Sequence, residues 1–134
     1  MRATSVAALA CCALALVACG TNSRKRHAPR PGQQVGEAVA ALQQDLVTRD
    51  YARICTEVFS SGARAQAGGD SCPDFVRRGA ADLHGERIRI RSIEVLGSKA
   101  SADVVTTAQG QAPVRETIEL IFENGRYRID SLAR

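Results

Sequence analysis

The dipeptide Asn124-Gly125 constrains the fold of this chain more than any other pair of residues. It separates two runs in which apolar and polar residues alternate, as they do in half-buried β-strands. Asparagine and glycine tolerate the positive φ angles of a type I′ turn, which joins two antiparallel strands through only two residues. Such a tight turn fixes the register of the hairpin. The expected pairs are Phe122 with Tyr127, Leu120 with Ile129, and Glu123 with Arg126.

The residues before this hairpin predict two further strands. The alternation of the first begins at Arg87 and changes phase at Arg91-Ser92, where a bulge would keep the apolar residues on one face and bend the strand. Glycine-containing turns separate it from a second strand over 100–108 and a third over 114–123. We therefore expect a curved, four-stranded antiparallel sheet. Its inward residues are expected to be Ile88, Ile90, Ile93, Val95, Ile118, Leu120, Phe122, Tyr127 and Ile129.

Upstream of the strands, apolar residues recur with the period of a helix and predict three helices. The first ends near Arg49, with Val35, Val39, Leu42 and Leu46 on its apolar face and Gln43, Gln44 and Asp45 on the opposite side. Asp50 is placed to cap a second helix, whose inward residues are Tyr51, Ile54, Cys55 and Val58. A capping box at Ser71 and Asp74 opens a third helix that Gly85 closes, with Phe75, Val76, Gly79, Ala80 and Leu83 facing inward.

Residues 1–19 have the organisation of a signal peptide. The run 6–19 carries no charge and as a helix would be about 21 Å long, shorter than the roughly 30 Å hydrocarbon core of a bilayer. The end of this run, Leu16-Val17-Ala18-Cys19-Gly20, resembles the lipobox of bacterial lipoproteins. The resemblance implies cleavage before Cys19, lipidation of the Cys19 thiol, and anchoring to the extracytoplasmic face of the bacterial cell membrane. An ordinary secretory signal and an uncleaved N-terminal anchor are the alternatives.

The basic character of the chain is concentrated in its front part. The formal net charge is +4, yet residues 35–134 carry 13 basic and 14 acidic side chains. Residues 20–34 have no acidic and no large apolar side chain, which predicts a tether that is either a solvated spacer or attracted to anionic lipids. Its basic residues are Arg24, Lys25, Arg26 and Arg30. A domain without an excess of basic residues is not expected to bind nucleic acid.

The domain retains two cysteines, Cys55 and Cys72. An even pair in an exported domain predicts a structural disulfide, which here would close a glycine-rich loop over 60–70 that is not expected to order by itself. A redox pair would favour C-x-x-C spacing. A metal site would need more ligands than His84, the one histidine of the domain, so no metal is expected.

The order of these features resembles the nuclear transport factor 2-like superfamily and, more narrowly, its small exported lipoproteins of high-GC bacteria. The residues that carry the resemblance are Arg49-Asp50-Tyr51, Cys55, Cys72-Pro73, 98–102 and 123–130. The resemblance implies an α+β cone over 35–134, with three N-terminal helices packed on the curved four-stranded antiparallel sheet. Members of this superfamily hold a cavity at the open end of the cone. The candidate lining residues here are Tyr51, Phe75, Phe122 and Tyr127.

The same resemblance leaves two classes of function open. Enzymes of the superfamily, such as ketosteroid isomerases and dehydratases, move a proton with an inward acid or histidine, but the inward strand positions of this chain are apolar. No motif for catalysis, a cofactor or a metal occurs. We therefore expect no catalytic residue, and a domain that binds a small apolar ligand or an envelope protein and can form a homodimer. A small cavity enzyme is the alternative.

One strand has an uneven distribution of charge. Three arginines alternate along the first predicted strand, and two more stand on neighbouring strands. They are Arg87, Arg89 and Arg91, with Arg115 and Arg128. This ridge is either solvated or the place where an anionic partner binds.

Overall fold

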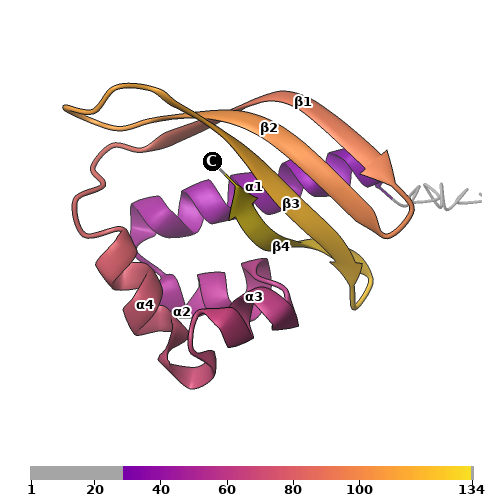
Figure 1. The fold of residues 1–134 in the computed structure, drawn as a ribbon, viewed down its shortest axis with the longest axis horizontal. Coiled ribbons are helices and arrows are strands. Elements are labelled where there is room, and N and C mark those ends of the chain that lie inside the picture. Colours follow the sequence, from indigo (N-terminus) through magenta and orange to yellow (C-terminus); the bar gives the residue numbers. More distant parts are fainter. Residues whose placement is uncertain (1–28, 134) are drawn as a thin grey trace, which may run out of the picture.

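The computed structural model describes residues 29–133 of the protein (Figure 1). The expected signal peptide, the lipidation site Cys19 and residues 20–28 lie outside the described residues. The helical elements are α1 (Pro31–Thr48), α2 (Tyr51–Arg53), the π-helical turn η1 (Ile54–Val58), α3 (Ser61–Gln66), the 3₁₀ turn η2 (Gly69–Ser71) and α4 (Cys72–Gly79). The strands are β1 (Arg87–Leu96), β2 (Lys99–Thr107), β3 (Val114–Glu123) and β4 (Arg126–Ala133). Over 29–133, no helix is both long and apolar enough to cross a membrane.

The four strands form one antiparallel sheet in the order β1-β2-β3-β4, which confirms the predicted fold class. All three pairs predicted for the last hairpin are present, and φ is 53° at Asn124 and 84° at Gly125. The predicted bulge lies between Ile90 and Ser92. A second irregularity, which the sequence pattern did not indicate, leaves Asp130 of β4 without a partner residue in the register with β3.

The molecule has two layers, because α1 packs along one face of the sheet (Figure 1). The shorter helices gather at one side of α1, below the sheet in this view. No described helix covers the opposite face, which we call the outer face. The side chains of β1 alternate accordingly between exposed positions and half-buried positions that pack on the core. The strands therefore present one face to the helices and one to solvent.

Helix α1 begins earlier than the apolar pattern predicted. It starts at Pro31, so residues 31–34, expected to be the end of the tether, are helical. Proline fits the first turn because its fixed φ suits a helix and its missing N–H has no helical acceptor there. The side chain of Gln34 donates a hydrogen bond back to the carbonyl of Pro29, and that of Gln33 donates one to Glu37. The first turn of α1 is thus held by polar contacts that an apolar pattern does not reveal.

The segment between the two cysteines is more ordered than expected. The expected loop contains α3, which is capped by Ser60: its hydroxyl accepts a hydrogen bond from the backbone N–H of Ala63. The same hydroxyl donates a hydrogen bond to Asp130 at 2.5 Å, and the Ser60 N–H donates one to the Ile129 carbonyl. The loop is therefore fastened to β4, a long-range contact that its local composition could not indicate.

The last helix differs in both its cap and its length. The side chain of Ser71 makes no capping bond, and the Asp74 carboxylate instead pairs with Arg77. The helix ends at Gly79, well before Gly85, where the low helix propensity of glycine favours a stop; Ala80 and Leu83 are buried or half-buried beyond the end of the helix. Phe75, expected on the inward face, is 55% exposed.

Cys55 and Cys72 form a disulfide that joins η1 to the start of α4, with 6.1 Å between their Cα atoms. Both are buried and form a small cluster with Ala67, against which Phe59 and Val76 pack. This cluster is separate from the main core between α1 and the sheet. The disulfide therefore fixes the peripheral helices to one another.

Candidate functional site

The concave side of the sheet, where the resemblance placed a cavity, is filled with apolar side chains. Helix α1 and η1 contribute five of them, and strands β2, β3 and β4 contribute the rest. The buried set is Val35, Val39, Leu42, Ile54, Val58, Ala100, Ala102, Val104, Ile118, Leu120, Tyr127 and Ile129. Of five hollows lined by described residues, four include no residue of α1. The remaining one, of about 170 Å³, lies at the edge of the core and is lined by Ala38 and Ala41 of α1 together with Val58 and Tyr127. The buried side chains therefore occupy the concave side, and the hollow beside α1 opens at its edge.

The four residues expected to line a cavity do not converge on one. The rings of Phe122 and Tyr127 meet edge to face at 5.2 Å between centroids, and the Tyr127 hydroxyl donates a hydrogen bond to the Gly97 carbonyl at 2.7 Å. The Tyr51 ring packs against the core, and its hydroxyl accepts a hydrogen bond from Arg49. Phe75 is exposed at α4. Of the four, only Tyr127 lines one of the five hollows.

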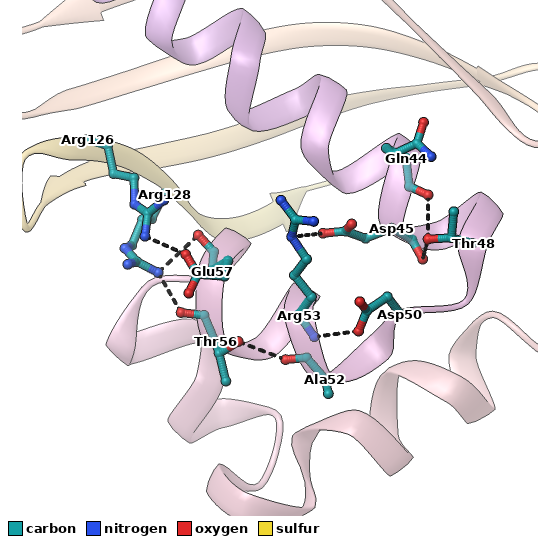
Figure 2. Close-up of polar contacts among 10 residues, drawn as sticks. All are labelled: Gln44, Asp45, Thr48, Asp50, Ala52, Arg53, Thr56, Glu57, Arg126 and Arg128. Atoms are coloured by element: carbon teal, nitrogen blue, oxygen red, sulfur yellow. Dashed lines mark hydrogen bonds and ion pairs between the residues drawn. The ribbon is translucent and has the colours of Figure 1, made fainter.

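A buried carboxylate that the sequence analysis assigned to the solvent side lies on α1. Asp45 is only 3% exposed, and its nearest cationic neighbour is Arg53, with 3.7 Å between Oδ2 and Nε (Figure 2). Burial raises the pKa of Asp45; the charge of Arg53 lowers it, and that of Asp50 raises it further. Its position could have been inferred from its spacing with Ala38 and Ala41, which widens the buried stripe of α1.

A second group of polar contacts in Figure 2 joins η1 to β4. The guanidinium of Arg128 donates hydrogen bonds to the carbonyls of Thr56 at 2.9 Å and Glu57 at 3.0 Å. Arg126 pairs with the Glu57 carboxylate at 2.6 Å, and this hydrogen bond lowers the pKa of Glu57. Arg128, expected to belong to the basic ridge, thus satisfies backbone carbonyls at the end of η1. The cluster fastens two elements together and leaves the ridge four arginines.

Replacing Asp45 with asparagine is expected to change how stability depends on pH. Because folding raises the pKa of Asp45, the folded state binds more protons than the unfolded chain, and stability falls as pH rises from about 4 through the raised pKa. The Asp45→Asn variant has no carboxylate at this position and therefore does not lose this stability as pH rises. Urea unfolding of both proteins between pH 3 and pH 8 measures it: the variant should gain stability relative to wild type as pH rises. A difference that stays constant with pH contradicts the prediction.

The outer face of the sheet carries three of the hollows. One of about 200 Å³ is lined by Arg87, Arg89, Arg91, Val105, Thr107 and Pro113. The next, of about 340 Å³, shares Arg91 and Val105 with it and adds Arg115, Asp103 and Glu116 among its lining residues. A third, of about 250 Å³, lies toward the β1–β2 turn and includes Leu96, Lys99 and Ile121. The structure therefore brings four arginines of the predicted ridge together at one end of the outer face.

The register of the sheet explains this grouping. Arg89 and Arg115 both pair with Val105, which stands between them on β2. Adjacent strands lie about 4.8 Å apart, so the two arginine backbones are separated by roughly 10 Å. Among the described residues, none of the four arginines forms an ion pair. The result is two adjoining hollows that share Arg91 and Val105: the first has three arginines on its walls, and the second holds Arg115 together with the carboxylates of Asp103 and Glu116.

His84 has no catalytic environment in the described part of the chain. Its Nδ1 accepts a hydrogen bond from the Arg49 guanidinium at 3.3 Å, and it lines none of the five hollows. Over 29–133, no three His, Cys, Asp or Glu side chains are grouped as a metal site would require.

No family model and no curated protein matches the chain. Solved structures are similar in fold. A SEC-C motif-containing protein from Rhodopseudomonas palustris superimposes with a TM-score of 0.56 at 14% identity, over 71% of this chain and 73% of its own. A nuclear transport factor 2-like protein of unknown function from Shewanella baltica OS155 gives 0.52 at 17%, over 74% and 87%. A de novo designed protein of the nuclear transport factor 2 fold gives 0.56 at 18%, over 78% and 87%. The chain therefore has the nuclear transport factor 2-like fold that the sequence analysis expected.

Proposed function

We propose that this protein is a lipoprotein anchored to the extracytoplasmic face of the cell membrane, and that its domain binds a partner protein without catalysing a reaction. Support for the anchor comes from the sequence around Cys19. Support for the binding role comes from one observation: α1 fills the concave side of the sheet and leaves the outer face as the broad uncovered surface. A nuclear transport factor 2-like domain arranged in this way offers its outer face to other molecules.

The partner that fits this face is an acidic surface of another envelope protein. Arg87, Arg89, Arg91 and Arg115 stand around Val105 and form no ion pair among the described residues. Asp103 and Glu116 line the hollow that holds Arg115, and four arginines against two carboxylates leave this end of the outer face basic. Arginine is enriched at protein interfaces because it combines a planar cation with an apolar stem. Carboxylates on a partner would neutralise the four positive charges and gain bidentate hydrogen bonds.

Photocrosslinking in intact cells tests this role. A benzoylphenylalanine replacing Val105, on the outer face between Arg89 and Arg115, should capture a single larger adduct. The same residue replacing Val47, which is exposed on α1, should not. Adding Arg89→Glu and Arg115→Glu should lower the yield from position 105 about tenfold, or about 1.4 kcal/mol of binding free energy.

Three results would overturn the proposal. Equal adducts from positions 47 and 105 would show no preference for the outer face. An adduct at 105 that survives both charge reversals would remove the role of the arginines. An adduct of twice the mass of this protein would assign the face to a homodimer.

The enzyme alternative has no comparable support. The carboxylate whose pKa is raised, Asp45, lies beside Arg53 and lines none of the five hollows. A general base must come within hydrogen-bonding distance of a proton on a bound substrate. Asp45 contributes instead to the packing of η1 and α2 against α1.

A further inference from the structure

Two large apolar side chains are exposed at the end of the sheet formed by the β1–β2 turn. Leu96 is 78% exposed and Phe122 is 44% exposed. Phe122 is held at this turn by its backbone, whose N–H donates a hydrogen bond to the Ser98 carbonyl at 2.6 Å. Its ring contacts Tyr127, which is bonded to Gly97 in the same turn. Phe122 is therefore held beside the turn that Leu96 enters, and we call this end of the domain the apolar tip.

The charges around the apolar tip are arranged in rows across the sheet. Lys99 pairs with Leu96 across the turn and is followed on β3 by Ile121. Glu94 and Glu119 stand on the next row of the outer face, away from the turn. The outermost row thus combines apolar side chains with a cation, while Glu94 and Glu119 lie further back. Glu123, which follows Phe122, also lies at this end, where its carboxylate accepts a hydrogen bond from the Ser61 N–H.

The apolar tip lies at the same end of the molecule as the start of α1 (Figure 1). Tyr127, which is bonded to the turn, shares a hollow with Gln34 and Glu37 in the first turns of α1. Residues 20–28 separate Cys19 from Pro29, so a fully extended chain spans at most about 36 Å between these two Cα atoms. Helix α1 alone is about 27 Å long. A lipid on Cys19 therefore places the apolar tip within easy reach of the bilayer surface, whereas the opposite end reaches it only if residues 20–28 extend back along most of the length of α1.

We propose that the apolar tip docks on the membrane surface, a step that rests on the lipid anchor proposed above. Leu96 and Phe122 enter the interfacial layer of the bilayer, and Lys99 faces the anionic headgroups. This contact attracts the protein to the membrane in addition to the lipid on Cys19, and more weakly. It also directs the far end of the outer face, with Arg87 and Arg115, away from the membrane.

Tryptophan fluorescence tests the proposal, because the chain has no tryptophan of its own. The full-length, lipid-modified protein carrying Leu96→Trp is reconstituted in vesicles of phosphatidylcholine and phosphatidylglycerol in which part of the lipid is brominated. Val114→Trp is the matched control: this apolar residue is 43% exposed and opens β3 at the opposite end of the sheet. We expect quenching of Leu96→Trp to be at least threefold stronger than that of Val114→Trp. Phe122→Trp should behave like Leu96→Trp and gives a second reporter if one variant fails to fold.

The outcomes separate this proposal from the anchor on which it rests. Flotation with the vesicles and a lipid mass on Cys19, both lost in Cys19→Ala, support the anchor. If the protein floats but the tryptophans at 96, 122 and 114 are quenched equally, the anchor stands and the docking of the apolar tip is wrong. If the wild-type protein neither floats nor carries lipid, both proposals fail.

Discussion

Replacing Cys55 and Cys72 with alanine is expected to lower the free energy of unfolding by about 3 kcal/mol. The disulfide closes a segment with a sequence separation of 17, and the loss of its constraint on the unfolded chain accounts for this value in the chain-entropy model. The segment also contains α3 and η2, whose short helices cannot be stable in isolation. Without the bond, η1 and α4 are joined to each other by the contacts around Ala67, Phe59 and Val76.

Urea unfolding of the delipidated protein measures this effect. The reduced wild-type protein serves as the control, because it removes the bond without changing the packing of either side chain's carbon atoms. Reduced wild type and the double variant should share a midpoint well below that of the oxidised protein. A reductant that leaves the midpoint unchanged would show that the bond does not stabilise the domain.

The second large effect is expected from Ile118→Ala. Ile118 lies on β3, is 1% exposed, and points toward α1 as part of the main core. Truncating a fully buried isoleucine removes its apolar contacts and leaves a cavity, at a cost of about 2–5 kcal/mol. We expect a loss in the upper half of that range, because α1 and the strands are held together at several other points and cannot move to fill the cavity.

Ile121→Ala is the matched control for this prediction. It has the same chemistry and lies on the same strand, but its register partners Lys99 and Arg128 place it on the outer face. We expect less than about 1 kcal/mol from it. Equal losses from Ile118→Ala and Ile121→Ala in thermal or urea unfolding would mean that the concave side is not the packed core.

The sheet could be predicted from the sequence because its determinants are local. Asn124-Gly125 set the turn and the register, and the change of phase at Arg91-Ser92 located the bulge. Each of these signals acts within a few residues, so a single sequence contains all the information needed. The pairing of Cys55 with Cys72 was also accessible, because the domain offers no other cysteine.

The helical part was less predictable because its contacts are distant in sequence. Ser60 caps α3 while it donates to Asp130, seventy residues away. Asp45 is buried because α2 and η1 fold back against the flank of α1. Arg128 does not join the basic ridge, because its guanidinium donates hydrogen bonds to carbonyls of η1. These arrangements depend on how elements pack, which hydrophobic periodicity does not determine.

The candidate site, too, was predictable where it depends on local sequence and unpredictable where it depends on packing. Alternation along the strands predicted a ridge of arginines that included Arg115, and the register places Arg115 across Val105 from Arg89. The expected cavity could not be tested by pattern alone, because whether a cone is open or filled depends on the depth to which α1 enters it. Val35, Val39 and Leu42 close that space.

Binding of xenon tests most directly the central claim that the concave side is filled and leaves the outer face for binding. Crystals of the delipidated domain under xenon pressure should show no xenon between α1 and the sheet in the wild-type protein. Crystals of Ile118→Ala should show one xenon there, because an apolar cavity of that size binds such a probe. Xenon between α1 and the sheet of the wild-type protein would contradict the account and would return the cavity, and with it the small-ligand and enzyme alternatives, to the concave side.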